Sequence, residues 1–343
     1  MKLSDFDYPL PEDRIAQAPL AERDASRLLV LDRARPELAH RTFRDIGEYL
    51  APGDLLVAND AKVIPARLRG TKVATGGKVE LLLCETLDAE GRRWRALGQA
   101  SKALRPGMRL RFAGGLEAEI EAEAGEGAYD VRLLADDIPA AIARAGELPL
   151  PPYIRRAPEN SDLARYQTVY AAHGTAAAAP TAGLHFTPEL IESLKAAGVR
   201  FATLTLNVGP GTFLPVRTED IRAHTMHAER FEIPAETAAA VAETRASGKR
   251  VIAVGTTSLR ALEAAAREDR TVNPGPASAQ LFIYPGYRFK VVDAMVTNFH
   301  LPKSTLVMLV SALAGRERIL AAYAEAVARG YRFFSYGDAM LII

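Results

Sequence analysis

Apolar runs in the last hundred residues end in polar clusters. Val251–Val254 leads into Gly255-Thr-Thr-Ser-Leu-Arg260, Val291-Val292 into Thr297–Thr305, and Tyr331–Phe334 into Ser335–Asp338. Burying hydroxyls, an amide, an imidazole and a guanidinium without partners would cost about 1–3 kcal/mol each. Ligands of α/β proteins bind where strands end and loops begin. The pattern therefore predicts an enzyme whose site is built from these clusters.

Between about residues 60 and 150, short apolar runs alternate with Gly- and Pro-rich turns. The predicted strands cover residues 78–83, 94–97, 108–112, 116–123 and 129–134. Turns at this spacing are typical of a small antiparallel barrel or sandwich.

On both sides of this region, helical and strand patterns alternate, as in parallel βα units. Helices are predicted at 188–197, 238–244, 259–267, 306–313 and 316–329, and strands at 28–32, 54–58, 200–206, 250–254 and 279–284. The simplest architecture is a discontinuous α/β domain of residues 1–59 and 151–343 with an all-β domain, residues 60–150, inserted into it.

Composition favours an ordinary globular protein, with 48% hydrophobic and 25% charged residues. No apolar run approaches the ~18 residues that span a bilayer, and the N-terminus lacks a secretory h-region. Cys84 is the single cysteine, so no intrachain disulfide can form, and its strand-like surroundings indicate a buried hydrophobe. A cytoplasmic location is expected.

Charge is distributed unevenly although the net charge is only +1. Residues 59–112 carry twelve basic and five acidic residues, whereas 113–150 carry two basic and nine acidic ones. The asymmetry can mark a phosphate-binding surface, or charged side chains on alternating strands that simply face water. The sequence leaves both interpretations open.

Gly255–Ser258 stands between a predicted strand and a predicted helix. Helix N-termini expose free N–H groups that bind anions. N-capping accounts for one hydroxyl, but not for Thr256, Thr257 and Ser258 together with Arg260. The segment therefore predicts an anion site, and the Gly-x4-Gly-Lys pattern of a P-loop is missing from it.

Two further segments carry candidate chemistry. Gly209 and Gly211 follow a strand and permit either a ligand's close approach or an ordinary tight turn. His224, His227 and Glu229 have the types of metal ligands, but nothing nearby completes a zinc set. A His227/Glu229 pair for proton transfer is the preferred interpretation.

The loop Thr297–Pro302 precedes an apolar, buried helix at 306–313. In this loop Asn298 can read a base edge, Phe299 can stack on a base, and His300 is either a site residue or a satisfied polar side chain. Its position at the mouth of a buried element favours a site.

Several long motifs resemble the S-adenosylmethionine:tRNA ribosyltransferase-isomerase family of queuosine biosynthesis. They are Arg23–Val30, Asn59–Arg67, Leu148–Ile154, Tyr166–Tyr170, Pro180–Thr187, Gly209–Phe213, His224–Glu229, Val254–Arg260, Thr297–Thr305 and Tyr331–Met340. The likeness runs from end to end. One departure is that Asn207 and Pro210 stand where the family usually has His and Ala, so an imidazole there cannot be essential, or Asn207 keeps only its hydrogen-bonding part.

The resemblance implies an enzyme, a transferase with a barrel-like α/β main domain and an inserted small antiparallel β-barrel. Its members move the ribosyl group of S-adenosylmethionine onto 7-aminomethyl-7-deazaguanine at the tRNA wobble position and isomerise it. Adenine and methionine leave, and epoxyqueuosine-tRNA is the product. S-adenosylmethionine is a co-substrate, no cofactor or metal is required, and we expect a monomer with no obligate protein partner and no membrane association.

Roles follow for particular residues. The candidates for removing the ribose C5′ proton are His185, His227, Glu229 and His300, which the sequence does not rank, and Asp338 or a histidine can protonate the leaving adenine. Gly255–Ser258 and Arg260 suit the methionine carboxylate. Tyr284, Phe299 and Tyr336 are candidates for base stacking. Arg23, Arg27, Lys62 and Arg67 are candidates for tRNA phosphates.

Two rival functions are a non-catalytic RNA-binding protein and a plain S-adenosylmethionine methyltransferase. The first predicts no turnover, and the second predicts S-adenosylhomocysteine as a product. Release of adenine and methionine distinguishes the ribosyl transfer from both.

Overall fold

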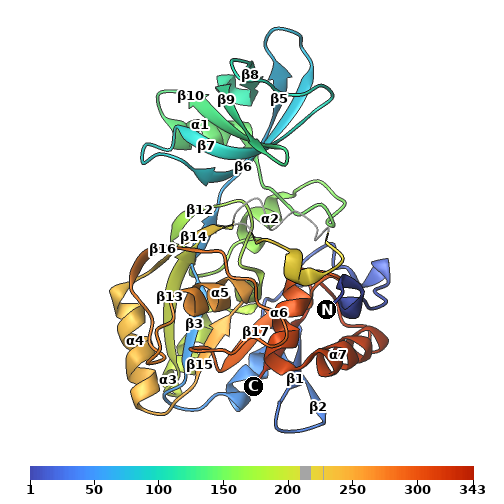
Figure 1. Cartoon of the computed structure of the whole chain (residues 1–343), viewed down its shortest axis with the longest axis vertical. Coiled ribbons are helices and arrows are strands. Elements are labelled where there is room, and N and C mark those ends of the chain that lie inside the picture. The colour runs from blue at the N-terminus through green and yellow to red at the C-terminus, as the bar shows by residue number, and fades with distance from the viewer. Residues whose placement is uncertain (209–217, 227) are drawn as a thin grey trace.

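The structure is a computed structural model that describes residues 1–208, 218–226 and 228–343. A large mixed sheet with helices forms the lower body in Figure 1, and a separate β-barrel lies above it. This arrangement confirms the predicted α/β class with an inserted antiparallel barrel. In the described ranges, no helix combines the length and the apolar character needed to cross a membrane.

The main sheet has nine strands. In spatial order they are β16 (Gly275–Ala279), β14 (Glu229–Ile233), β13 (Arg200–Leu206), β3 (Leu55–Asn59), β15 (Val251–Val254), β17 (Ala294–Asn298), β18 (Ala339–Ile342), β1 (Arg27–Leu31) and β2 (Leu38–Thr42). The central strands β13, β3, β15 and β17 run parallel, as expected for βα units.

The central strands are nearly continuous apolar runs because both faces of the sheet are covered. Leu55, Val57 and Ala253 belong to the core under α4 (Ala235–Ala246), α5 (Thr256–Ala264), α6 (Thr305–Ala314) and α7 (Arg316–Ala328). Their neighbours Leu56 and Ile252 face the second core with α3 (Pro188–Ala196). Such two-sided burial is typical of parallel strands between helices.

The barrel closes on itself. Its strands are β5 (Arg67–Lys72), β6 (Lys78–Thr86), β7 (Arg93–Ala100), β10 (Ala128–Leu134), β9 (Glu117–Gly125) and β8 (Arg109–Phe112), with β8 paired back to β5. α1 (Ile138–Ala145) packs into the barrel core, and β11 (Gly146–Glu147) pairs with β5. Burial raises the pKa of the Cys84 thiol in β6 to about 12, which fits a buried hydrophobe.

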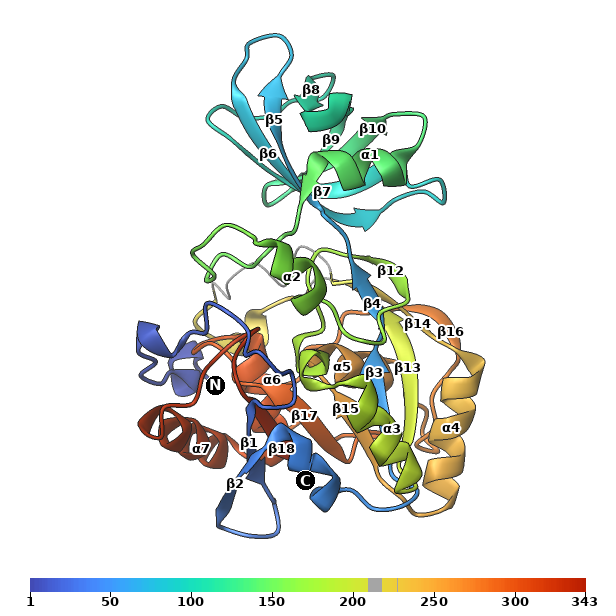
Figure 2. The ribbon, with the colours of Figure 1, turned by 180° about the vertical axis from the view of Figure 1, so that it is seen from behind.

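A short connection joins the two parts. β4 (Ala61–Val63) continues from β3 toward the barrel and pairs with β12 (His173–Ala176), while α2 (Asn160–Arg165) lies beneath the barrel (Figure 2). The barrel strands fall inside the predicted insert of residues 60–150, and the exact boundaries of both domains stay a prediction.

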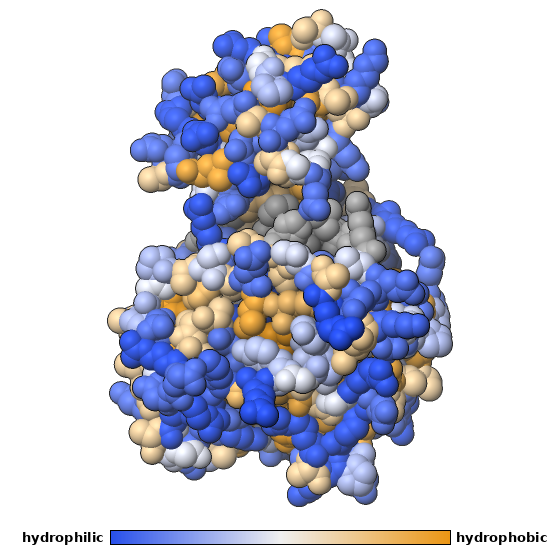
Figure 3. All heavy atoms as spheres, in the orientation of Figure 1, coloured by the Kyte–Doolittle hydropathy of each residue, from blue (hydrophilic) through white to orange (hydrophobic). Residues whose placement is uncertain are grey.

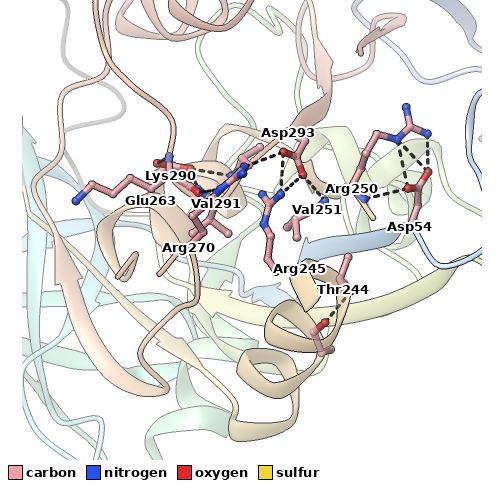
Figure 4. A network of polar contacts seen from close by, with 12 residues as sticks. Asp54, Thr244, Arg245, Arg250, Val251, Glu263, Arg270, Lys290, Val291 and Asp293 are labelled. Atoms are coloured by element: carbon pink, nitrogen blue, oxygen red, sulfur yellow. Dashed lines mark hydrogen bonds and ion pairs between the residues drawn. The ribbon is translucent and has the colours of Figure 1, made fainter. Parts of the chain in front are cut away.

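The amino ends of the central strands are held by two acids, Asp54 and Asp293 (Figure 4). Asp54, just before β3, pairs with Arg250, just before β15. Burial raises the pKa of Asp54, but hydrogen bonds from Arg250 hold this pKa below its ordinary value. Asp293 accepts from the Val251 amide at 2.8 Å and pairs with Arg245 at 2.7 Å. These contacts fix one end of the sheet, so the opposite, carboxyl ends are left for the site.

One predicted strand is wrong beyond its first residue, and one of the apolar runs does not form a strand. Residues 280–284 lie outside β16. Ile283 is buried in the core, but it belongs to no strand. Residues 331–334 form only an isolated bridge at Phe333, because Phe334 has φ 70° and breaks the extended chain. The Ser335–Asp338 cluster therefore precedes a strand, β18, instead of following one.

Candidate functional site

A cavity of about 510 Å³ opens at the carboxyl ends of β15 and β17. Its volume lies within the roughly 300–1,000 Å³ of small-molecule sites. Eight of the predicted site residues line it: Glu229, Gly255, Thr256, Thr257, Arg260, Asn298, Phe299 and His300. Figure 3 shows apolar side chains gathered at the centre of the main body's visible face, around the position of α5 in Figure 1. The hydroxyl-bearing turn and the imidazole-bearing loop thus open onto one space.

The first turn of α5 forms one wall. Gly255 joins β15 to α5 with φ 92°, a conformation that other residues rarely adopt. Ser258 is fully buried and its hydroxyl donates to the Val254 carbonyl at 2.9 Å. Thr257 Oγ1 instead accepts from Asn59 Nδ2 at 3.3 Å, which leaves its own proton for a ligand. The turn therefore offers Thr256 and Thr257, but not Ser258.

A buried ion pair forms the second wall. Arg260 on α5 and Glu229 at the start of β14 approach to 2.5 Å, and both are more than nine-tenths buried. The Nε and the second terminal nitrogen of Arg260 have no hydrogen-bond partner among the described residues. Since buried donors are normally satisfied, these two nitrogens are suited to a ligand's acceptor.

Asn298, at the end of β17, is held in one orientation. Its Nδ2 donates to the Phe334 carbonyl and to His185 Nε2, both at 3.1 Å. His185 Nδ1 is 2.7 Å from Ser26 Oγ, and the Ser26 hydroxyl donates onward to the Arg23 carbonyl at 3.3 Å. This network assigns the Nδ1–H tautomer to His185. Asn298 Oδ1 is left buried and without a hydrogen-bond partner in the described part of the chain.

His300 stands beside Asn298 in the cavity wall. Thr297 Oγ1 donates to the Asn298 carbonyl at 3.3 Å and lies 2.7 Å from His300 Nε2. The network therefore assigns the proton to Nε2 and the lone pair to Nδ1. Burial lowers the pKa of His300 to about 3, so the imidazole is neutral at physiological pH.

The three candidates for base stacking do not offer a free ring to the cavity. Phe299 touches the cavity, but it is fully buried, with its ring centroid 4.9–5.6 Å from those of Tyr323, Tyr331 and Phe333. The Tyr336 hydroxyl donates to Asp162 at 2.7 Å, and its ring lies outside the cavity lining. Tyr284 packs against the main core and Phe282 instead.

Other predicted residues are not brought together by this cavity. Asp338 accepts from the Arg27 and Arg332 amides and pairs with the Arg27 side chain at 3.2 Å. His185 lies behind Asn298, and burial lowers its pKa to about 3. Gly209, Gly211 and His227 lie outside the described residues.

Three further residues at the site were not singled out individually in the sequence. Tyr153 and Ser335 line the wall and share a hydrogen bond at 2.6 Å. Asn59 accepts from the Ala61 and Leu206 amides while it positions Thr257. An Asn directly after an apolar strand was the only available signal for it.

Comparison with known proteins agrees with this geometry. The model of the family described as "Queuosine biosynthesis protein" matches residues 3–342. The chain belongs to this family. It is 61% identical to the S-adenosylmethionine:tRNA ribosyltransferase-isomerase of Anaeromyxobacter dehalogenans strain 2CP-C, over 100% of this chain and 99% of the relative. The protein of that name from Pelotomaculum thermopropionicum is 55% identical, over 100% of both chains.

A solved structure is also similar. The crystal structure of S-adenosylmethionine tRNA ribosyltransferase from Thermotoga maritima is 41% identical and has a TM-score of 0.56. The alignment covers 99% of this chain and 100% of the Thermotoga chain.

The residues expected to hold RNA phosphates in this family member differ in availability. Arg27 is engaged by Asp338 and by the Arg329 and Gly330 carbonyls. Arg67 is 3.4 Å from Glu80 and donates to the Leu150 carbonyl. Arg23 donates to two carbonyls, whereas Lys62 is exposed on β4.

The charge asymmetry of the insert largely cancels across its strands. Arg111 pairs with Glu117 at 2.8 Å, and Glu121 pairs with both Arg93 and Arg132. Cross-strand pairs of opposite charge are favourable neighbours in a sheet. The basic half of the insert thus faces its own acidic half, which favours the simpler of the two interpretations.

A metal centre finds no support in the described ranges. Within residues 1–208, 218–226 and 228–343, no three His, Cys, Asp or Glu side chains gather closely enough to hold an ion. Glu229 is paired with Arg260, and the His224 ring lies edge-on to Phe282 at 5.3 Å.

Proposed function

We propose that this family member transfers and isomerises the ribosyl group of S-adenosylmethionine onto 7-aminomethyl-7-deazaguanine at the tRNA wobble position. Adenine and methionine leave, and epoxyqueuosine-tRNA is formed. The observation that carries the proposal is the single cavity that unites the α5 turn, the Arg260–Glu229 pair and the Asn298–His300 loop. The end-to-end membership of the family gives the reaction.

The Arg260–Glu229 pair suits the methionine end of S-adenosylmethionine. That end carries a carboxylate and an ammonium on one carbon, and the pair presents a guanidinium and a carboxylate 2.5 Å apart. The two unpartnered Arg260 nitrogens and the first amides of α5 would bind the carboxylate. Glu229 would attract the ammonium, so the zwitterion enters a buried pair without leaving a net charge unmatched.

His300 is our candidate for removal of the ribose C5′ proton. The neighbouring sulfonium acidifies that C–H, so a modest base suffices. Nδ1 carries the lone pair and has no partner among the described residues, so it is available to accept a proton. Glu229 is the alternative base within the same cavity.

Asn298 Oδ1 would accept an N–H from a substrate base or from an amino group. Two hydrogen bonds from Nδ2 fix the orientation of this buried acceptor. A ligand that presents an acceptor to Oδ1 would therefore be repelled. Discrimination of this kind is strong because a mismatched ligand leaves a buried polar group unpaired.

The remaining proposals concern conditions of action. We place the protein in the cytoplasm as a monomer without an obligate protein partner, and we assign it no bound metal or organic cofactor. S-adenosylmethionine and the tRNA carrying 7-aminomethyl-7-deazaguanine are its substrates. The sulfonium itself supplies the activation that a metal would otherwise provide.

Labelled S-adenosylmethionine and tRNA carrying the deazaguanine test the reaction directly. Release of adenine and methionine with mass added to the tRNA is the expected result. Production of S-adenosylhomocysteine would identify a methyltransferase, and tRNA binding without turnover would identify an RNA-binding protein. The matched control is the same tRNA with guanine at the wobble position, which should release no adenine because it lacks the attacking amine.

A further inference from the structure

A second, smaller hollow lies next to the cavity. It has a volume of about 20 Å³ and a half-open mouth, and three arginines from distant segments line it: Arg23, Arg165 and Arg332. It shares Ser335 with the cavity, and His185 in its wall bonds Asn298 in the cavity wall. We call this hollow the arginine notch.

The three guanidiniums are held by neutral acceptors only. Arg23 donates to the Leu184 and Ala164 carbonyls at 3.1 and 2.7 Å. Arg165 donates to the Leu20 and Ala21 carbonyls at 2.6 and 2.7 Å. Arg332 donates to the Ala18 and Tyr336 carbonyls.

No carboxylate of the described chain forms an ion pair with any of these three arginines. Glu22, the one acid in the notch lining, pairs with Arg44 at 2.7 Å, and Asp338 pairs with Arg27. Most other arginines of the main body have an acid within 4.0 Å, so three arginines without an ion pair in one hollow are a local exception among the described residues.

The notch arginines also have donors without partners among the described residues. The Nε atoms of Arg165 and Arg332 are buried and have no hydrogen-bond partner in the described part of the chain. Burial, opposed by too little negative charge, lowers the pKa of Arg23 and of Arg332. An anion in the notch would satisfy the donors and offset the desolvation of the cations.

The size of the notch narrows the class of anion. A volume of about 20 Å³ is sufficient for one water-sized atom. A single phosphate oxygen is of that size, while the remainder of the phosphodiester can stay at the open mouth. Arginine is the preferred partner of phosphate because its fork of donors matches the phosphate oxygens.

We propose that Arg23, Arg165 and Arg332 bind one phosphodiester of the tRNA whose wobble base enters the neighbouring cavity. The assignment rests on the proposed function for the identity of the RNA. It adds Arg165 and Arg332 to the substrate-binding residues and gives Arg23 a specific place.

Arg165→Gln tests this site, since glutamine keeps a donor for the carbonyls and removes the charge. The measurement is the affinity for tRNA carrying the deazaguanine over a series of KCl concentrations. We expect weaker binding and a smaller slope of log Kd against log salt, with a decrease of at most about 0.7–0.9, the contribution of one phosphate, because Arg23 and Arg332 remain. Arg165→Lys should restore most of the slope.

Arg318→Gln is the matched control. Arg318 on α7 also donates only to backbone carbonyls, those of Asp32, Arg33 and Arg35, and it lines neither hollow. If the notch arginines only fasten the chain, Arg165→Gln and Arg318→Gln will both lower the melting temperature and leave the salt slope unchanged, which overturns the proposal.

Two more outcomes have distinct meanings. Reduced S-adenosylmethionine affinity in Arg165→Gln with an unchanged salt slope would assign the notch to the methionine carboxylate and overturn the phosphodiester. Failure of the wild-type protein to release adenine would contradict the proposed function, whereas the salt slopes would still report on the notch, because they require binding and no turnover.

Discussion

Arg260 and Glu229 show how burial changes the meaning of a single residue. From the sequence, Arg260 is a candidate anion ligand and nothing more. In the structure it is 6% exposed and neutralises a carboxylate that is 4% exposed. Removing one partner of a buried ion pair costs about 3–5 kcal/mol. Arg260→Ala would therefore lower both the ligand affinity and the stability of the fold, and the two effects could not be separated.

Arg260→Lys separates the two effects. Lysine keeps the positive charge beside Glu229 but loses the planar set of donors, including the two that have no partner in the described residues. We expect S-adenosylmethionine affinity, measured by calorimetry, to fall about 10–100-fold, equivalent to one charge-assisted hydrogen bond. The melting temperature should change much less than in Arg260→Ala. Equal affinity in the lysine variant and the wild type would remove Arg260 from the binding site.

His185 is expected to act through Asn298. His185→Phe keeps a ring against Phe43, whose centroid is 5.0 Å away, but removes the acceptor for Asn298 Nδ2. Losing a hydrogen bond of about 1 kcal/mol should lower kcat/KM roughly five- to tenfold. His185→Gln can present an amide oxygen and should recover part of that loss. A purely structural role predicts no such recovery at matched melting temperature.

The residue scale also shows where sequence reasoning ends. Arg260, Asn298, His300 and the Gly255–Thr257 turn meet in one cavity, as their positions after strands predicted. Phe299 does not offer its ring, because the aromatic cluster around Tyr323 buries it completely. A motif gives the order of residues along the chain, but the direction of each side chain depends on the packing of distant elements.

At the scale of elements, the first turn of α5 divides its hydroxyls between two tasks. Ser258 donates back to the Val254 carbonyl, four residues earlier, and stays within the helix. Thr257 receives the Asn59 amide and keeps its proton for the cavity. Three consecutive hydroxyls suggested three donors for a ligand. Because successive residues of a helix point in different directions, the Ser258 side chain points into the core instead.

Thr257→Val and Ser258→Ala form a matched pair that tests this division. Valine preserves the shape of threonine but lacks the hydroxyl, so S-adenosylmethionine should bind about 5–10-fold more weakly, as for one lost hydrogen bond. Ser258→Ala should leave that affinity unchanged, because its hydroxyl never reaches the ligand. The reverse order in a calorimetric titration would contradict the placement of the two side chains.

Some strands were easier to predict from the sequence than others. Period-two patterns located β6 to β10 closely, but no strand was predicted over β2, β4, β5, β12, β14, β17, β18 or the short β11. β5 (Arg67–Lys72) includes Gly70, whose missing side chain leaves space for the Arg111 backbone across the barrel. A glycine and several charges weaken the strand pattern, although the closure of the barrel depends on the β5–β8 pairing.

At the scale of the whole molecule, two neutral histidines make stability depend on pH. Burial lowers the pKa of both His185 and His300 to about 3, while an unfolded chain holds histidine near 6.5. Between these values the unfolded chain binds more protons than the folded protein. The free energy of unfolding must therefore fall as pH decreases below about 6.5, and above that pH the two histidines contribute no pH dependence.

The window from about pH 6 to pH 4.5 isolates this effect, because carboxylates such as Asp162, with a pKa lowered to about 2, act mainly below pH 4. Within the window each buried histidine should remove about 1.4 kcal/mol of stability per pH unit. Urea unfolding of His300→Gln should show roughly half the wild-type slope. His173→Gln, at an exposed position on β12, should keep the full slope. A wild-type unfolding free energy that stays constant across the window would mean that burial does not lower the pKa of the two imidazoles, which would contradict the pH dependence expected here.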